Sequence, residues 1–213
     1  MDRYVPPGIQ NWDEYKRANF GKVALQFEHQ YDRHPLFSDE ALARLLENVE
    51  RQDYYVNTMD VSGHNTQSRR EGEIGNLSGI EILDAVRRGH IWILLLRPDR
   101  VEPLYNEVLK EIYEDIARNQ PGFKSFLEKM TILISSPLVQ VYYHCDIPGQ
   151  TLWQVRGTKR VFVYPNRPPF LNQVALEKIV LGEAHEISLA SIRRSTRMRL
   201  FMICDPAKCF IGL

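Results

Sequence analysis

The chain has 213 residues, 44% of them apolar, and its 27 basic residues balance 27 acidic ones. This length predicts one domain with a substantial core, and the balanced charge makes nucleic acid or an anionic membrane an unfavoured partner. The longest apolar run, Ile91 to Leu96, is far shorter than the roughly 20 residues that cross a bilayer, and no signal-peptide pattern opens the chain. Three cysteines without a Cys-x-x-Cys spacing favour a reduced, cytoplasmic setting.

Helices are predicted in the first half of the chain. Ser38 is placed to cap a helix over 38–49, whose apolar residues recur at helical spacing. Ser78 and Glu81 form a capping-box pattern for a second helix over 78–88. A third helix is predicted over 101–118, with a broad apolar face. These helices are expected to cover the outside of a sheet.

Strands and a polar loop complete the predicted elements. The apolar run 91–96 reads as a buried strand, and the polar residues 53–76 predict a loop, either over an active-site mouth or plainly on the surface. Later strands are predicted over 139–144, 151–156 and 159–164. With strands concentrated after Thr131, the expected fold is α+β, mainly β with a helical N-terminal part.

A candidate pair of metal ligands lies at the end of the predicted strand 139–144. Alternation over 139–144 predicts that His144 ends the strand on its polar face, with Asp146 just beyond it. An imidazole and a carboxylate two positions apart can both reach one ion, as two ligands of a 2-His-1-carboxylate triad. Such a site keeps positions open for a co-substrate and dioxygen, so the indicated chemistry is oxidative. Cys145 is expected to point the other way and to pack.

Lys159 begins the third of these later strands, predicted over 159–164. Gly157 and Thr158 turn the chain into the strand that Lys159 begins, where its side chain shares a pleated face with Val161 and Val163. We expect this face to lie beside the strand of the metal pair, where an ammonium group is placed to bind the far carboxylate of a dicarboxylic acid. The alternative is a surface lysine in a hairpin.

The residues from about Leu133 to Pro165 resemble the Jumonji C-like or cupin-like iron(II) and 2-oxoglutarate-dependent hydroxylases, most closely the asparaginyl-hydroxylase branch. That branch follows its His-x-Asp pair with a strand, a turn and a Gly-x-Lys-Arg segment ending in an aromatic residue and proline. Lys159 stands fifteen positions after His144, the offset of that branch. The resemblance implies that His144 and Asp146 bind Fe(II) and that Lys159 grips the distal carboxylate of 2-oxoglutarate.

The resemblance also implies a fold and a reaction. The fold would be a double-stranded β-helix, the jelly-roll or cupin barrel, over residues 131–189, with residues 1–130 packed on it. The reaction would couple oxidative decarboxylation of 2-oxoglutarate to hydroxylation of a C–H bond in an unidentified protein or small-molecule substrate. Tyr142 and Gln150 are candidate pocket residues, as is Trp153, and Gln150 and Trp153 could instead be structural.

Two positions depart from the family pattern. Similar enzymes carry a second histidine on a later strand, but here only His185 follows, 41 positions after His144 and within a linker-like segment. Alternatively, His185 is a solvated or core histidine that binds no metal. Similar enzymes often place a hydroxyl residue three positions before the first histidine, where this chain has Val141.

The segment 190–213 differs from the rest of the chain in its charge and in its residue pattern. It carries four arginines and one lysine against one aspartate, and shows a strand pattern only at 199–203. We expect a truncated or out-of-frame terminus and therefore an incomplete barrel, with a basic nucleic-acid-binding tail as the alternative. Two functions stay open: an iron(II) and 2-oxoglutarate-dependent dioxygenase, impaired if the third ligand is missing, and a catalytically silent cupin-like binding or scaffold protein.

Overall fold

The computed structural model describes residues 8–58, 70–141, 143–147, 149–184, 200–204, 206 and 208–211, and of 200–204, 208, 210 and 211 the backbone alone. Helices and antiparallel strands are mixed along the chain, which confirms the α+β class. The chain divides into two compact units: unit 1 comprises Met1–Ile9 and Arg33–Val141, and unit 2 comprises Gln10–Asp32 and Tyr142–Leu213. The expected division at residues 130 and 189 stays a prediction.

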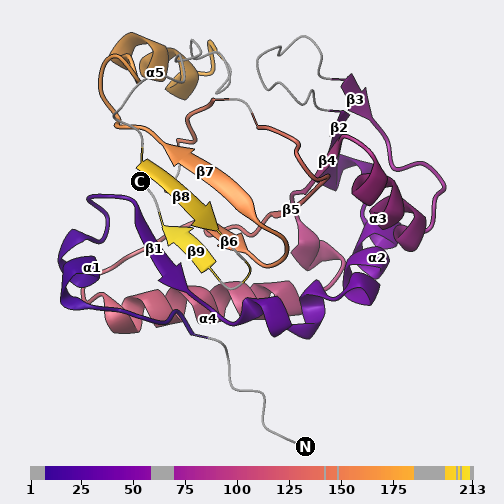
Figure 1. Cartoon of the computed structure of the whole chain (residues 1–213), viewed down its shortest axis with the longest axis horizontal. Coiled ribbons are helices and arrows are strands. Elements are labelled where there is room, and N and C mark those ends of the chain that lie inside the picture. The colour runs from indigo at the N-terminus through magenta and orange to yellow at the C-terminus, as the bar shows by residue number, and fades with distance from the viewer. Residues whose placement is uncertain are drawn as a thin grey trace, which may run out of the picture. The chain divides into compact units, whose positions relative to one another are not determined.

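Unit 1 is built on a four-stranded antiparallel sheet in the order β3-β2-β4-β5 (Figure 1). Its strands are β2 (Tyr54–Thr58), β3 (Arg70–Gly72), β4 (Ile91–Leu95) and β5 (Ile132–Ser135). Its α-helices are α2 (Asp39–Asn48), α3 (Gly79–Arg88) and α4 (Leu104–Asn119).

The core of unit 1 lies on one face of this sheet. Alternate residues of three paired strands make that face: Tyr54, Val56, Ile93, Leu95, Ile132 and Ile134. Apolar side chains of α2 and α3 pack against it, together with one residue of α4: Leu42, Leu45, Leu46, Ile82, Leu83, Val86 and Tyr105. Burial of each large apolar side chain contributes roughly 1.5–3 kcal/mol, so this cluster stabilises the unit.

The predicted helix starts are confirmed at two of three positions. Ser38 Oγ accepts from the Ala41 N–H at 3.2 Å, and Ser78 and Glu81 form the complete capping box. The third helix begins at Leu104 rather than at residue 101: a 3₁₀ turn covers Pro98–Arg100, and Pro103 is the N-cap residue of the helix. These caps satisfy N–H groups that a helix leaves without partners at its start.

Helices α2 and α3 approach each other closely at Gly79. A Cβ atom on Gly79 would lie 2.1 Å from the carbonyl oxygen of Ala43 on α2. The Gly79 N–H donates to Glu47 Oε1 at 2.7 Å, so a carboxylate of α2 lies at the N-terminus of α3. This contact also complements the positive end of the α3 dipole.

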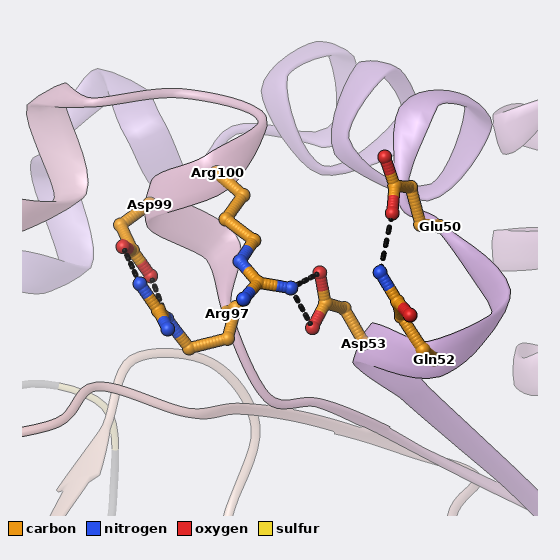
Figure 2. Close-up of polar contacts among 6 residues, drawn as sticks. All are labelled: Glu50, Gln52, Asp53, Arg97, Asp99 and Arg100. Atoms are coloured by element: carbon orange, nitrogen blue, oxygen red, sulfur yellow. Dashed lines mark hydrogen bonds and ion pairs between the residues drawn. The ribbon is translucent and has the colours of Figure 1, made fainter.

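A polar cluster fixes the ends of β2 and β4. Figure 2 shows Arg100 reaching Asp53, whose two carboxylate oxygens each accept from Arg100 Nη1 at 2.8 Å. The Asp53 side chain is 8% exposed, whereas that of Arg100 is 48% exposed. Beside them, Arg97 makes two hydrogen bonds to Asp99 and thereby lowers the pKa of that carboxyl group. The stability that Asp99 contributes is therefore lost as the pH falls through its lowered pKa.

Replacing Arg100 with methionine should lower the free energy of unfolding by about 2 kcal/mol, because it leaves the buried Asp53 carboxylate without its donor. Urea unfolding measures the change. Arg87→Met is the matched control, since Arg87 also bonds two carboxylates but both are exposed, so a clearly smaller loss is expected. Equal losses in the two variants would contradict the buried-carboxylate explanation.

Unit 2 contains a three-stranded antiparallel sheet in the order β1-β9-β6 and a separate antiparallel pair of β7 with β8. The strands are β1 (Leu25–Glu28), β6 (Thr151–Gln154), β7 (Lys159–Val163), β8 (Leu200–Cys204) and β9 (Lys208–Ile211). Its helices are α1 (Glu14–Asn19) and α5 (Gln173–Val180). Across the sheet, Phe27, Cys209 and Trp153 stand in register, and Phe27 and Cys209 are fully buried.

Several predicted strand positions were wrong. Strands do not concentrate after Thr131, because β1 to β4 precede it. Residues 53–76 are not one loop, since β2 and β3 occupy part of the segment and pair with each other; residues 59–69 lie outside the described part. Among described residues, 139–144 contains no strand. Pro137 has no N–H for a ladder and Leu138 adopts a φ of +66°, which together end the extended run after β5.

The second half of the chain also gave two strands that the sequence did not predict, β5 and β9. The expected strands 151–156, 159–164 and 199–203 correspond to β6, β7 and β8, each within one or two residues. β9, however, was missed, and it lies between β1 and β6. In the part of the chain that the structure describes, every helix is too short or too polar to cross a membrane.

Candidate functional site

The predicted metal pair is brought together in unit 2. His144 Nε2 lies 3.5 Å from Asp146 Oδ2, and the two side chains are 34% and 39% exposed. Both residues belong to a segment with no regular secondary structure, whereas His144 was predicted to end a strand and Asp146 to lie just beyond it. The pair therefore forms without a sheet, between side chains two positions apart in the sequence.

This donor set suits a divalent metal ion. A neutral imidazole and a carboxylate are the protein ligands of the iron(II) facial triad. Among the described residues, no group of three or more His, Cys, Asp or Glu side chains is arranged to hold a metal. His185, the predicted further ligand, lies outside the described residues, as does Tyr142, the candidate pocket residue.

Lys159 begins β7, as predicted, but its strand has a different neighbour. Its side chain and those of Val161 and Val163 are half-buried, whereas Arg160 and Phe162 are exposed, so the predicted face alternation is confirmed. β7 pairs with β8, where Cys204 stands opposite Lys159. The expectation that the segment of His144 and Asp146 lies beside it as a strand was therefore wrong, because the described residues of that segment form none.

The weaker candidates lie on and beside β6. Gln150 is exposed and directly precedes the strand. Trp153 packs against the buried rings of His29 and Tyr31, with ring centroids 5.2 and 5.3 Å away, and its Nε1 donates to Thr151 Oγ1. These contacts favour the structural alternative for Trp153.

Sequence reasoning missed the residue that ties the metal pair to the rest of unit 2. The Tyr143 hydroxyl donates to the carbonyl oxygen of Phe170 at 2.7 Å. Burial raises the pKa of Tyr143, so its hydroxyl stays a donor at neutral pH. The tyrosine beside His144 was visible in the sequence, but its partner 27 positions later was not. Next to it, Cys145 is half-buried and its Sγ lies 3.8 Å from the Asp146 carbonyl oxygen.

A surface groove of about 400 Å³ lies in unit 1, along α4. Asn106, Lys110, Tyr113, Ala117 and Glu128 are among its lining residues, and the lining contains no histidine or cysteine. The groove therefore includes none of the sequence-predicted site residues. The metal pair of unit 2 remains the stronger candidate for chemistry.

The chain matches no family model, and no curated protein is significantly similar to it. Function is therefore inferred from the residues of the candidate site.

Proposed function

We propose that this chain is an iron(II) and 2-oxoglutarate-dependent oxygenase with a cupin-like barrel, in which His144 and Asp146 are metal ligands and Lys159 binds the co-substrate. The distance of 3.5 Å between His144 Nε2 and Asp146 Oδ2 carries the proposal. Donor atoms about 2.1 Å from one ion, at right angles, lie roughly 3 Å apart. A small rotation of two partly exposed side chains covers the difference.

The cupin-like barrel is the part of the proposal that concerns the fold. Every strand pair of the described residues is antiparallel, as a jelly roll requires. Antiparallel pairing is common to many folds, so the site residues remain the basis of the functional proposal.

Each residue of the proposed site has its own task. Bound iron together with 2-oxoglutarate and dioxygen would supply the oxidising power for hydroxylation. His144 binds metal through the Nε2 lone pair of its neutral form and Asp146 through its carboxylate. Metal affinity should therefore decrease as the pH is lowered. Lys159 holds the distal carboxylate by a charge-assisted hydrogen bond, and Val161 and Val163 on the same face exclude water. His185 is the histidine that follows His144 in the sequence, so it is the candidate for a third ligand, and a solvated or core histidine is its alternative.

Anaerobic titration with iron(II), followed by measurement of succinate released from 2-oxoglutarate in air, tests the proposal. The oxygenase should take up one iron per chain and release succinate. A second candidate, a catalytically silent binding or scaffold protein, is favoured by the lack of a third suitable donor among the described residues. A folded chain that binds iron weakly or not at all, and releases no succinate, would support this second function.

Replacing Lys159 with alanine should weaken 2-oxoglutarate binding by roughly ten- to a hundredfold, since a hydrogen bond between charged groups is lost. Iron affinity should stay the same, because the lysine is not a metal ligand. Isothermal titration of the manganese-loaded protein with 2-oxoglutarate measures the effect.

Arg160→Ala is the matched control for Lys159. It removes a cation one position along β7, on the exposed face of the strand, and should leave co-substrate affinity within about twofold of the wild type. If the two variants behave alike, Lys159 does not belong to the site.

A further inference from the structure

We infer that Tyr143 is a positioning residue that holds His144 and Asp146 in the arrangement that binds metal, through its hydrogen bond to Phe170 and its ring contact with Tyr164. This inference rests on the proposed function. It adds a residue to the site that is neither a metal ligand nor a co-substrate ligand.

The contacts of Tyr143 form a compact anchor within unit 2. Its hydroxyl donates to the Phe170 carbonyl oxygen at 2.7 Å, and its ring meets that of Tyr164 edge to face at 5.2 Å. The Tyr164 ring in turn packs on Phe170 at 5.4 Å, and Phe170 is 3% exposed. The polar end of Tyr143 is therefore held by the buried Phe170, and its apolar body by the half-buried Tyr164.

The anchor matters because of where the metal pair lies. Residues 143–146 belong to no helix or strand, so no sheet ladder fixes the direction of His144 and Asp146. Tyr143 directly precedes His144 and restrains the backbone from which both ligands project. Partly exposed side chains on irregular backbone lose conformational freedom when they bind an ion, and an anchor reduces that loss.

The same anchor connects the two halves of the proposed site. Tyr164 directly follows β7, the strand that Lys159 begins. Through Tyr143 and Tyr164, the metal-pair segment is tied to the far end of that strand. A change at Tyr143 should therefore disturb metal binding more than its effect on overall stability predicts.

The test compares two tyrosine-to-phenylalanine variants of the full chain. Tyr143→Phe removes the bond to Phe170, while Tyr105→Phe removes an equivalent bond, 2.7 Å from the Tyr105 hydroxyl to the Leu36 carbonyl oxygen, in unit 1. Cobalt(II) is the probe, because its visible absorption reports the ligand arrangement. His144→Ala is included to test the ligand itself.

Tyr143→Phe should weaken cobalt(II) affinity by roughly three- to tenfold and change the cobalt absorption band, as expected for one lost hydrogen bond. Hydrogen exchange should increase in peptides that cover residues 143–147. Tyr105→Phe should leave affinity and spectrum unchanged, although it lowers stability by a similar amount.

The outcomes separate the two proposals. If cobalt binds through His144 in the wild type but Tyr143→Phe matches Tyr105→Phe in affinity and spectrum, the positioning role is wrong and the proposed metal pair stands. If the wild type binds no cobalt, or His144→Ala binds it equally well, the proposed function fails and the positioning role with it.

Discussion

Replacing His144 with alanine should lower the affinity for iron(II) or cobalt(II) by at least about a hundredfold and abolish succinate release. The variant loses one of the two donors that lie 3.5 Å apart, and even the loss of a residue that only orients a metal ligand weakens metal binding ten- to a hundredfold. Asp146→Ala should have an equally large effect, because it removes the anionic donor. Anaerobic metal titration and the succinate assay measure both variants.

His90→Ala serves as the control for this loss. His90 is exposed and belongs to unit 1, so its removal should leave metal affinity and turnover unchanged. The melting temperature of His144→Ala in thermal unfolding should stay close to that of the wild type, since His144 is partly exposed. Wild-type metal affinity in His144→Ala would show that His144 is not a ligand.

Replacing Gly79 with alanine is expected to cause the largest loss of stability, about 3 kcal/mol or more. The new Cβ atom would lie 2.1 Å from the carbonyl oxygen of Ala43 and 2.5 Å from its carbonyl carbon. These are backbone atoms, so no side-chain rotation relieves the clash and α2 and α3 must separate. The gain in helix propensity, at most about 1 kcal/mol, does not offset this. Urea unfolding of the full chain measures the loss.

Gly72→Ala is the matched control in the same unit. Its Cβ would lie 3.7 Å from a methyl group of Val56, which is ordinary van der Waals contact. Its stability should therefore stay within about 0.5 kcal/mol of the wild type. A Gly79→Ala variant as stable as Gly72→Ala would show that the two helices are not as close as the structure places them.

Local signals in the sequence predicted the helices α2, α3 and α4 and several strands, but not α1 and α5. The capping box of Ser78 and Glu81 and the cap at Ser38 depend on residues three positions apart, so the sequence contains all the partners. β4 was predicted from its apolar run, and β7 from its alternation after Gly157, whose φ of +63° makes the turn.

The predictions failed where pairing partners were distant. The segment 139–144 alternates like a strand, but Leu138 breaks the extended backbone before it. β9 pairs with β1, near the N-terminus, and with β6, both distant from it in the sequence, and no local pattern shows such pairing. Strand formation requires a neighbour as well as an alternating sequence.

The candidate site likewise combines features that are local in the sequence with contacts between distant residues. The chemistry of the proposed site was inferred from residue types and spacings that are local, those of His144, Asp146 and Lys159. Their spacing also indicated that His144 and Asp146 can turn to the same side. The contact that holds this pair is a tertiary feature, since the hydrogen bond from Tyr143 joins residues 27 positions apart. The approach of Gly79 to Ala43 was likewise a tertiary result, because contacts between distant segments depend on how the whole unit packs.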